Sequence, residues 1–560
     1  MKGFGKKQNK NQIKCSDENL IKVALDFHAK GKINDALINY KKIINSGIED
    51  PRVYCGMGLI VLQNKKIDQA IKYNLKAVGL DPKYSNAYSN LGLIFCQIGN
   101  FDEAEKYLRK AISIDSKDAK LFLNLGEILY KRLELDDAEE VIRQAIDLNP
   151  NIILSYYSLS KILRAKEDYL QAEKTIKKAI KIGPEESKSY FLLHEIYEQA
   201  GCLEKSKETL RKSLMIDQRF ALAYYALSRF SFCKDDKDLY DNLFKLDTQQ
   251  IKSREDKINI LFAKSNLRHR QNKFLESSKY LKEANDLKLK LYNSSADKLI
   301  QKSKDYLIET SKFQLNESKK FEKPEECVFI VGMPRSGSTL TESILSINDK
   351  SFDLGERPLI ENAFQKSCDL FKNSEVQLSF YQLYLEERNK FVNTGCISTD
   401  KYLYNYIYLG FILSNFPSAK VIHSFRNPLD NILSIYRSHF SEGVRFSSSL
   451  RDCARVYVNH MLIIKEYQRR FPMKIYPLNY DLLVSNPSTE IRNLISWLDW
   501  DWDDIYLSPH LVHRNIKTAS VIQARSPINS NSVGGWKNYK NMLEPAIIEL
   551  GKYEVDDYQY

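Results

Sequence analysis

The N-terminal half of the chain repeats every 34 residues, and this period constrains the fold more than any other feature. One position of the repeat is always alanine: Ala36, Ala70, Ala104, Ala138 and Ala172. Other positions in the same phase are also small or proline: Ala77, Ala111, Ala145 and Ala179; Gly58, Gly92 and Gly126; Pro82, Pro150 and Pro184, with Ser116 standing in once. Small residues let two helices approach closely, and proline is tolerated where no further helical N–H is needed. The period predicts a solenoid of antiparallel helical hairpins.

This pattern resembles the tetratricopeptide repeat, with units from about Asn19 to Phe220. The resemblance implies an all-α solenoid over residues 19–234, followed by a Lys-rich helical connector, residues 235–325, that holds a degenerate repeat in KFLESSKYLKEANDLK. Repeat arrays usually bind rather than catalyse. We therefore expect a protein or peptide on the concave face, with self-association as the alternative and a homodimer left open.

Composition narrows the class of protein. A chain of 560 residues is long enough for two or more domains. It has no apolar run near the roughly 20 residues that cross a bilayer, so we expect no membrane span. Residues 1–18 are basic and polar and do not form a secretory signal, which predicts a disordered tail and a cytoplasmic protein. The richness in Lys, Asn and Ile indicates an AT-rich genome, and the absence of sorting signals predicts a bacterial cytoplasm.

Charge and cysteine content exclude further classes. The net charge of +12 is spread along the chain among many Asp and Glu residues, so we expect a polyanionic small molecule or an acidic partner rather than nucleic acid. Nine cysteines stand singly, without a CxxC pair, and His510 and His513 have no partner set of ligands. The sequence therefore predicts neither a disulfide framework nor a metal site.

The composition changes at Glu326, where the apolar run CVFIVG precedes MPRSGSTLTESIL. This pattern predicts a strand, a loop and a helix, with loop N–H groups and the helix N-terminus directed at an anion. A Walker loop would place lysine where this chain has Ser338, and here the cation comes earlier, from Arg335. A nucleotide-dependent kinase is therefore disfavoured.

VFIVGMPRSGSTL resembles the 5'-phosphosulfate loop of sulfotransferases, especially tyrosylprotein sulfotransferases and bacterial proteins that join tetratricopeptide repeats to a sulfotransferase domain. Later segments are similar to other motifs of the family: AKVIHSFRNPLDNILS, LNYDLLV and TASVIQARSPINSNSVGGWKNY. The resemblance implies a co-substrate, 3'-phosphoadenosine 5'-phosphosulfate (PAPS), with the 3'-phosphate held by Arg426 and Ser434. The implied donor-binding residues are Pro334, Arg335, Ser336, Gly337, Ser338, Thr339, Arg426, Ser434, Tyr480 and Trp536.

The same resemblance implies four catalytic residues: Glu356, Lys401, Arg335 and Ser520. Glu356, in a GE phrase, is the expected general base, with Asp353 ranked second. Lys401 would neutralise charge on the bridging oxygen, while Arg335 and Ser520 complete the clamp on the sulfuryl group. His423 is expected to be a core or supporting histidine. Asn427, where many relatives have aspartate, and the phrase Tyr402-Leu-Tyr404 depart from the family pattern.

The resulting expectation is an α plus α/β protein: an all-α repeat solenoid, then a P-loop-like three-layer α/β domain over residues 326–560 with a central parallel sheet. Its expected activity is sulfuryl transfer from PAPS to a hydroxyl of protein tyrosine, a saccharide or a small alcohol, without a metal. The alternative is a repeat scaffold whose C-terminal domain binds a nucleotide but does not catalyse.

Overall fold

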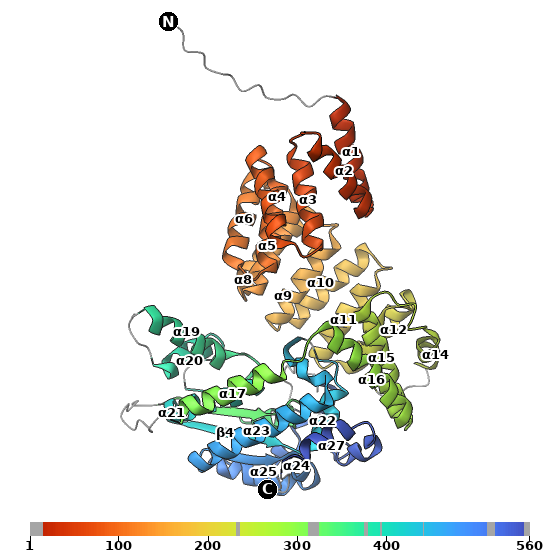
Figure 1. The fold of residues 1–560 in the computed structure, drawn as a ribbon. Helices are drawn as coiled ribbons and strands as arrows, with labels where there is room; N and C mark the ends of the chain where they lie inside the picture. Colours follow the sequence, from red (N-terminus) through yellow and green to blue (C-terminus); the bar gives the residue numbers. More distant parts are fainter. Residues whose placement is uncertain are drawn as a thin grey trace. The chain divides into compact units, whose positions relative to one another are not determined.

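The computed structural model describes residues 15–230, 236–311, 324–373, 379–392, 395–440, 442–511 and 521–553 (Figure 1). The chain divides into two compact units, residues 1–196 and residues 197–560. Residues 1–14 of the predicted tail, residues 1–18, lie outside the described part of the chain. The first helix begins at Cys15. The division between the units falls inside a helix of the predicted solenoid, Ser187–Gln199.

The first unit consists of helical hairpins. Its helices are α1 (Cys15–Ala29), α2 (Ile33–Asn45), α3 (Pro51–Gln63), α4 (Ile67–Leu80), α5 (Ser85–Gln97), α6 (Phe101–Ile114), α7 (Ala119–Lys131), α8 (Leu135–Leu148), α9 (Ile153–Ala165), α10 (Tyr169–Ile182) and the start of α11 (Ser187–Gln199). The repeated alanines of α2, α4, α6, α8 and α10 are completely buried. At Gly92 of α5, an added Cβ would lie 2.7 Å from Leu108 Cγ of α6. The small residues of the period are therefore required by the close approach of paired helices.

The second unit begins with further helices and continues into a sheet. The helices before the sheet are α12 (Leu203–Ile216), α13 (Ala221–Ser228), α14 (Lys237–Lys245), α15 (Arg254–Arg270), α16 (Phe274–Leu291) and α17 (Ala296–Thr310). The strands are β1 (Cys327–Gly332), β2 (Ser351–Gly355), β3 (Ile397–Asp400), β4 (Ala419–Phe425) and β5 (Ile475–Asn479). They form one parallel sheet in the order β2-β3-β1-β4-β5.

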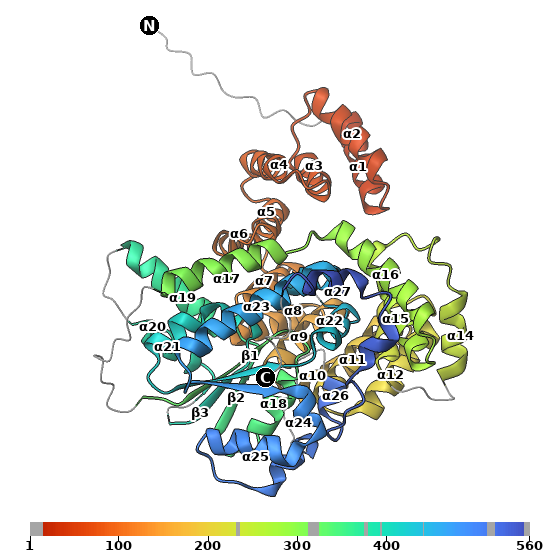
Figure 2. The ribbon, with the colours of Figure 1, turned by 60° about the horizontal axis from the view of Figure 1, so that its bottom comes forward.

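The sheet is covered on both faces, which confirms the predicted three-layer α/β domain. Alternate residues of β1 point to opposite sides. Phe329 and Val331 pack on the face covered by α19 (Leu359–Asn373), α20 (Phe380–Arg388) and α23 (Leu450–Arg470). Val328 and Ile330 pack on the face covered by α18 (Ser338–Leu345) and α25 (Pro487–Trp497). Figure 2 shows these helices on the two sides of the sheet. All six residues of β1 are buried. A strand buried on both faces is apolar throughout rather than alternating, as the run CVFIVG is.

The remaining helices surround the sheet. They are α18 (Ser338–Leu345), α19 (Leu359–Asn373), α20 (Phe380–Arg388), α21 (Leu409–Asn415), α22 (Pro428–Tyr436), α23 (Leu450–Arg470), α24 (Tyr480–Ser485), α25 (Pro487–Trp497), α26 (Val521–Ala524) and α27 (Glu544–Leu550). Short 3₁₀ helices are η2 (Leu403–Tyr408), η3 (Glu442–Ser448), η4 (Asp504–Leu507), η5 (Pro509–Leu511) and η6 (Gly535–Tyr539). Within the described ranges, no helix combines the length and apolarity needed to span a bilayer.

Strand order places the candidate site. After β1 the chain adds β2 and then β3 on one side of β1, with β3 between the other two. It later adds β4 and β5 on the opposite side. The carboxyl end of β1 therefore lies where the strand order reverses, the position at which parallel α/β sheets bind ligands. In the β1–β4 pairing, Gly332 lies opposite Ser424. The residues that follow both strands are consequently brought together.

Candidate active site at the carboxyl ends of the strands

The loop after β1 has a backbone conformation that residues with a side chain rarely adopt. Arg335 has φ +67° and Gly337 has φ +104°, both in the left-handed region. A Cβ on Gly337 would collide with the ring of Tyr480, so only glycine fits this position. Within the loop the Ser336 N–H donates to Met333 O at 3.2 Å, and α18 begins at Ser338. The loop thus delivers backbone N–H groups and a helix N-terminus to one place.

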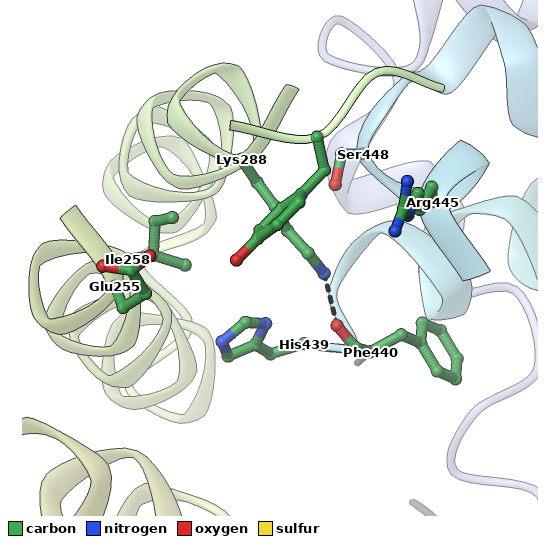
Figure 3. Close-up of a pocket in the computed structure, with 8 residues that line it drawn as sticks. Glu255, Ile258, Lys288, His439, Phe440, Arg445 and Ser448 are labelled. Atoms are coloured by element: carbon green, nitrogen blue, oxygen red, sulfur yellow. Dashed lines mark hydrogen bonds between the residues drawn. The ribbon is translucent and has the colours of Figure 1, made fainter. Parts of the chain in front are cut away.

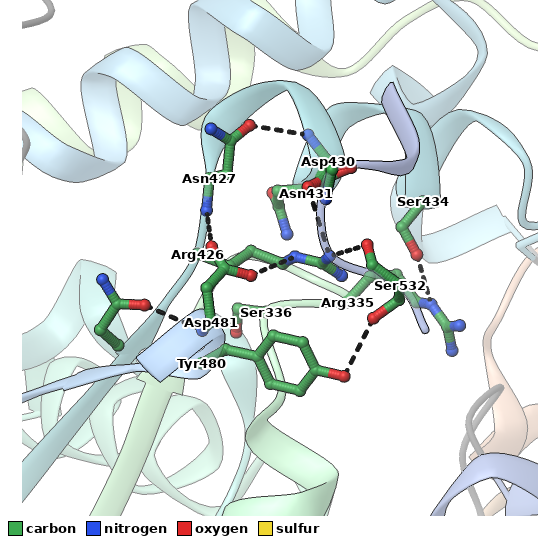
Figure 4. Close-up of polar contacts among 12 residues, drawn as sticks. Arg335, Ser336, Arg426, Asn427, Asp430, Asn431, Ser434, Tyr480, Asp481 and Ser532 are labelled. Carbon is green, nitrogen blue, oxygen red and sulfur yellow. Dashed lines mark hydrogen bonds and ion pairs between the residues drawn. The ribbon is translucent and has the colours of Figure 1, made fainter. Parts of the chain in front are cut away.

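The other loop residues named by the sequence lie in the same turn. Ser336, Ser338 and Thr339 are buried at 1%, 5% and 7% exposure. The Pro334 carbonyl accepts from Asn431 Nδ2 at 3.0 Å, which fastens the loop to α22 (Figure 4). Ser424 Oγ of β4 donates to Ser336 O at 3.0 Å. The loop is therefore fixed by the neighbouring strand and by the helix that follows it.

Arg335 is held by residues from two distant segments. Its Nε donates to Ser434 Oγ at 3.1 Å, and its Nη2 donates to Gln523 Oε1 at 2.7 Å. Burial and then the positive charge of Arg426 lower the pKa of Arg335 to about 10. The guanidinium remains charged at neutral pH, and Arg426 lies close enough to influence its pKa (Figure 4).

Arg426 follows β4 and is 5% exposed. Its Nη2 donates to Ser532 O at 2.7 Å, and its guanidinium lies 4.8 Å from the centre of the Tyr480 ring. Asp430 and Asp481 approach it at 3.9 and 3.8 Å (Figure 4). Among the described residues, the carboxylates nearest to Arg426 are these two, and both lie farther away than the 2.7 Å that separates Lys401 from Glu356.

The structure places Ser434 against Arg335, although the sequence grouped it with Arg426. Both residues come from the segment after β4, but Ser434 lies further along α22 on the side that faces the β1 loop. Arg426 instead contacts Ser532 and the Tyr480 ring. The two arginines and Ser434 nevertheless line one region, and their roles toward a donor remain predictions.

The segment that includes residues 521–536 closes this region. Asp430 Oδ2 accepts from the Gly534 N–H at 2.6 Å, and its Oδ1 accepts from the Trp536 N–H at 2.9 Å. The Trp536 side chain is partly buried and packs against the core formed by α22, α23 and α27. Ser520 lies outside the described residues, as does His513.

The structure explains how Asn427, which departs from the family pattern, fits at its position. Its side chain accepts from the N–H groups of Leu429 and Asp430 and so caps α22, as aspartate also can. Its own N–H donates to Asp481 Oδ2 at 2.7 Å. The substitution therefore preserves the helix start.

A second cluster lies at the ends of β2 and β3. Lys401 is completely buried, and its Nζ lies 2.7 Å from Glu356 Oε1 and 3.6 Å from Glu342 Oε2. The Glu356 side chain is 42% exposed, whereas Glu342 is 3% exposed. Asp353 lies within β2, opposite Thr399 of β3. Of the two candidate bases, Glu356 is the one joined to Lys401.

Tyrosines and a buried carboxyl surround this cluster. Burial raises the pKa of Asp400 to about 7. Its Oδ1 accepts from the Tyr402 N–H at 3.1 Å and from Asn405 Nδ2 at 2.8 Å. The hydroxyl of Tyr402 donates to Glu361 at 3.4 Å, and that of Tyr404 donates to Gly443 O at 2.9 Å. The phrase Tyr402-Leu-Tyr404, which departs from the family pattern, thus lines the region beside Lys401.

Sequence reasoning missed Gln523, Asp430, Asp481 and Ser532. Asp430 and Asp481 had one available signal, because each lies in the first turn of a helix after a strand, α22 and α24. Gln523 and Ser532 carry no such signal, because contacts distant in sequence bring them to the arginines. Among the residues placed by the structure, no three His, Cys, Asp or Glu side chains are grouped as metal ligands.

Buried histidines predict acid sensitivity of the second unit. His423 and His460 face each other with Nε2 atoms 3.0 Å apart. Burial lowers the pKa of His423, His439 and His269 to about 3, and that of His460 also falls well below its ordinary value. In the unfolded chain these histidines bind protons near pH 6.5. The free energy of unfolding therefore has its full value above that pH and falls as pH drops toward 3, by up to about 1.4 kcal/mol per pH unit for each histidine. The raised pKa values of Asp400 and Asp481 act in the opposite sense, but they are two groups against four.

Urea unfolding at pH 7.5, 6 and 5 measures this effect. All four tryptophans, Trp497, Trp500, Trp502 and Trp536, belong to the second unit, so their fluorescence reports on that unit. We expect the free energy of unfolding to fall by more than about 1 kcal/mol per pH unit below 6.5. A free energy that stays constant from pH 7.5 to 5 would contradict the assignment of neutral buried histidines.

Comparisons with known proteins agree with the two folds. Residues 327–504 match the model of the sulfotransferase family. Residues 85–118, and residues 51–84, 119–152 and 153–186, match models of the tetratricopeptide repeat. An uncharacterized protein of Aquifex aeolicus (strain VF5) is 33% identical over 251 residues, which are 41% of this chain and 33% of that protein. The chain thus spans about a third of the length of that relative.

The solved structures that are similar to part of this chain include repeat proteins. MamA 41-end from Desulfovibrio magneticus RS-1 is 22% identical, with a TM-score of 0.25, over 29% of this chain and 92% of that one. PilF of Pseudomonas aeruginosa is 19% identical, with a TM-score of 0.30, over 37% and 94%. YrrB, described as a TPR protein with an unusual peptide-binding site, is 22% identical, with a TM-score of 0.28, over 33% and 96%.

The family matches coincide with the helical hairpins of the first unit and with the parallel sheet of the second. The sulfotransferase match begins at the first residue of β1 and includes all five strands and the loop that carries Arg335. Residues 51–186 are tetratricopeptide repeats, and residues 327–504 belong to the sulfotransferase family.

Proposed function

We propose that the C-terminal domain transfers a sulfuryl group from PAPS to a hydroxyl acceptor. The pair Arg335 and Arg426 at the ends of adjacent strands carries this proposal. Two like charges close together repel each other, and a ligand with two anionic groups would relieve that repulsion. A nucleotide with a 3'-phosphate and a 5'-phosphosulfate has this charge distribution.

The loop chemistry favours this donor over a nucleoside triphosphate. Ser338 begins α18 where a Walker loop has lysine to reach the β- and γ-phosphates. The cation is Arg335, which contacts Ser434 and Gln523. The Tyr480 ring, held between Gly337 and Arg426, provides a flat surface beside the anion site. These residues fit a single 5'-phosphate followed by a sulfuryl group.

In the proposed reaction the acceptor hydroxyl oxygen forms a bond to sulfur. The bond between sulfur and the 5'-phosphate oxygen breaks, and its electron pair leaves with adenosine 3',5'-bisphosphate. The acceptor proton moves to the carboxylate of Glu356, the half-exposed member of the second cluster. Lys401, which donates a hydrogen bond to that carboxylate at 2.7 Å, holds it in position. Arg335 balances negative charge on the leaving phosphate.

We assign recruitment to the repeats. Repeat arrays present extended surfaces that bind proteins or peptides, and residues 51–186 belong to this class. The acceptor, in this proposal, is a hydroxyl of a protein tyrosine or a saccharide. The repeats hold the acceptor or a partner that delivers it.

Binding and transfer assays on the full chain test the proposal. We expect adenosine 3',5'-bisphosphate to raise the melting temperature in the presence of EDTA, and labelled sulfate to pass from PAPS to a component of a mixed peptide and saccharide pool. Stabilisation without transfer to any acceptor would favour a non-catalytic nucleotide-binding module. A requirement for Mg²⁺ together with preference for ATP would overturn the donor assignment.

A further inference from the structure

A cavity of about 150 Å³ lies between the helical connector and the segment after α22. Its lining comes from α15, α16, η3 and the turn before η3: Glu255, Ile258, Lys288, Tyr292, His439, Phe440, Arg445 and Ser448 (Figure 3). The lining is mainly apolar and includes the aromatic residues Tyr292 and His439. None of these residues is among those that line the candidate active site.

Lys288 brings a buried positive charge to this cavity. It is 6% exposed, and its Nζ donates to the main-chain oxygen of Phe440 at 2.6 Å (Figure 3). An ammonium has three N–H donors, so two remain after this bond. No carboxylate of the described chain lies within ion-pair distance of Lys288 Nζ, and the one acidic lining residue, Glu255, is exposed at the edge. Burial lowers the pKa of Lys288 to about 8, so the side chain is still mostly charged at neutral pH.

Two further polar atoms in the lining also have unused bonding capacity. Ser448 is 3% exposed, and its Oγ is buried without a hydrogen-bond partner in the described structure. His439 Nδ1 is likewise buried and without a partner there. The His439 ring stacks on Phe262 at 4.8 Å between ring centres, which fixes its orientation. Buried polar atoms are normally satisfied, so a cavity lined by such groups indicates a ligand that bonds to some of them.

The size and polarity of the cavity define the class of ligand. A cavity of this volume accommodates a single six-membered ring. The aromatic and apolar lining suits the ring, and the Lys288 ammonium with the Ser448 hydroxyl suits a carboxylate on it. Arg445, which lies 5.8 Å from the Tyr292 ring, adds a second positive charge at the exposed edge. An unsubstituted hydrocarbon would leave the buried ammonium without a counter-charge.

We propose that the cavity formed by α15, α16 and η3 binds a small ring-bearing carboxylate, at a site separate from the proposed donor site. The carboxylate receives hydrogen bonds from Lys288 and Ser448, and the ring packs between Ile258, Tyr292 and His439. The site is independent of sulfuryl transfer, because the argument uses none of the residues assigned to that reaction.

Calorimetric titration of the full chain with benzoate and cyclohexanecarboxylate at pH 7 tests the site. We expect both to bind, and benzamide, which has the same ring without the charge, to bind about tenfold or more weakly, because a charge-assisted hydrogen bond is lost. Lys288→Met should lower benzoate affinity by about the same factor. The matched variant Lys290→Met changes an exposed lysine on the same helix and should bind benzoate like the natural protein.

Two further variants keep the test decisive. Ser448→Leu fills the cavity and should abolish binding even if Lys288→Met proves too unstable to measure. Arg426→Met should leave benzoate affinity unchanged, because that arginine belongs to the other site. The proposal is overturned if the folded natural protein binds neither carboxylate, if neither cavity variant weakens binding, or if Arg426→Met alone abolishes it.

Discussion

Replacing Glu356 with glutamine is expected to lower kcat for sulfuryl transfer by about 10²–10⁴-fold, the usual contribution of a positioned general base. Glutamine has nearly the same shape but cannot accept the acceptor proton. Glu356 is 42% exposed, so the change should leave the fold intact, and the proposed donor contacts do not include it. Affinity for adenosine 3',5'-bisphosphate should therefore stay within about twofold. Initial rates with labelled PAPS and calorimetric titration of the bisphosphate measure the two quantities separately.

Asp353→Asn is the matched comparison for this prediction. It removes the carboxylate that ranks second as a base, which lies within β2 rather than at its end. We expect kcat to change by less than about tenfold, well below the effect of losing a general base. The opposite pattern, with Asp353→Asn inactive and Glu356→Gln active, would transfer the role of base to Asp353. Equal loss of nucleotide affinity and rate in Glu356→Gln would show that Glu356 supports the site rather than the proton transfer.

Arg426→Met is expected to reduce affinity for adenosine 3',5'-bisphosphate by about 10²–10³-fold. Truncating one partner of a buried, hydrogen-bonded charge pair commonly costs about 2–5 kcal/mol, and Arg426 is 5% exposed. If Arg426 binds the 3'-phosphate, adenosine 5'-monophosphate should bind the variant and the natural protein almost equally. Titration of both nucleotides thus assigns the arginine to one phosphate.

Two other variants complete the comparison. Arg335→Met should weaken both nucleotides, because Arg335 lies in the loop proposed for the 5'-phosphate. Arg451→Met removes an arginine that is 66% exposed on α23 and should alter neither affinity. If Arg426→Met weakens the monophosphate and the bisphosphate by the same factor, Arg426 does not bind the 3'-phosphate. That result would favour the pair Arg335 and Ser434 as its site, in keeping with their contact at 3.1 Å.

Local sequence was sufficient to predict the helices and strands that carry the site. The period of 34 residues predicted helical hairpins because small residues recur where helices cross, as the 2.7 Å approach at Gly92 illustrates. The run CVFIVG predicted a strand, and all six of its residues are buried, as expected of a parallel strand covered on both faces. Motif order predicted Glu356 and Lys401 as separate catalytic residues, and the structure brings them within 2.7 Å of each other.

Contacts between distant segments required the tertiary structure. Motif order grouped Ser434 with Arg426, yet the packing of α22 against the β1 loop turns Ser434 toward Arg335. Gln523 and Ser532 reach the two arginines through a closing segment that begins about a hundred residues after β4. No local pattern encodes such contacts, because they depend on how the closing segment folds back over the sheet.

The sequence by itself determined the two fold classes, the phosphate-loop motif and the residue types available for the chemistry. These features follow from periodicity, turn stereochemistry and charge, which act over a few residues or one repeat. Tertiary structure alone decided which partner each arginine contacts, which carboxylate meets Lys401, and that α16 and η3 enclose Lys288 in a cavity. Side chains from distant segments meet only when the sheet and its covering helices pack, and burial then sets both their charges and their partners.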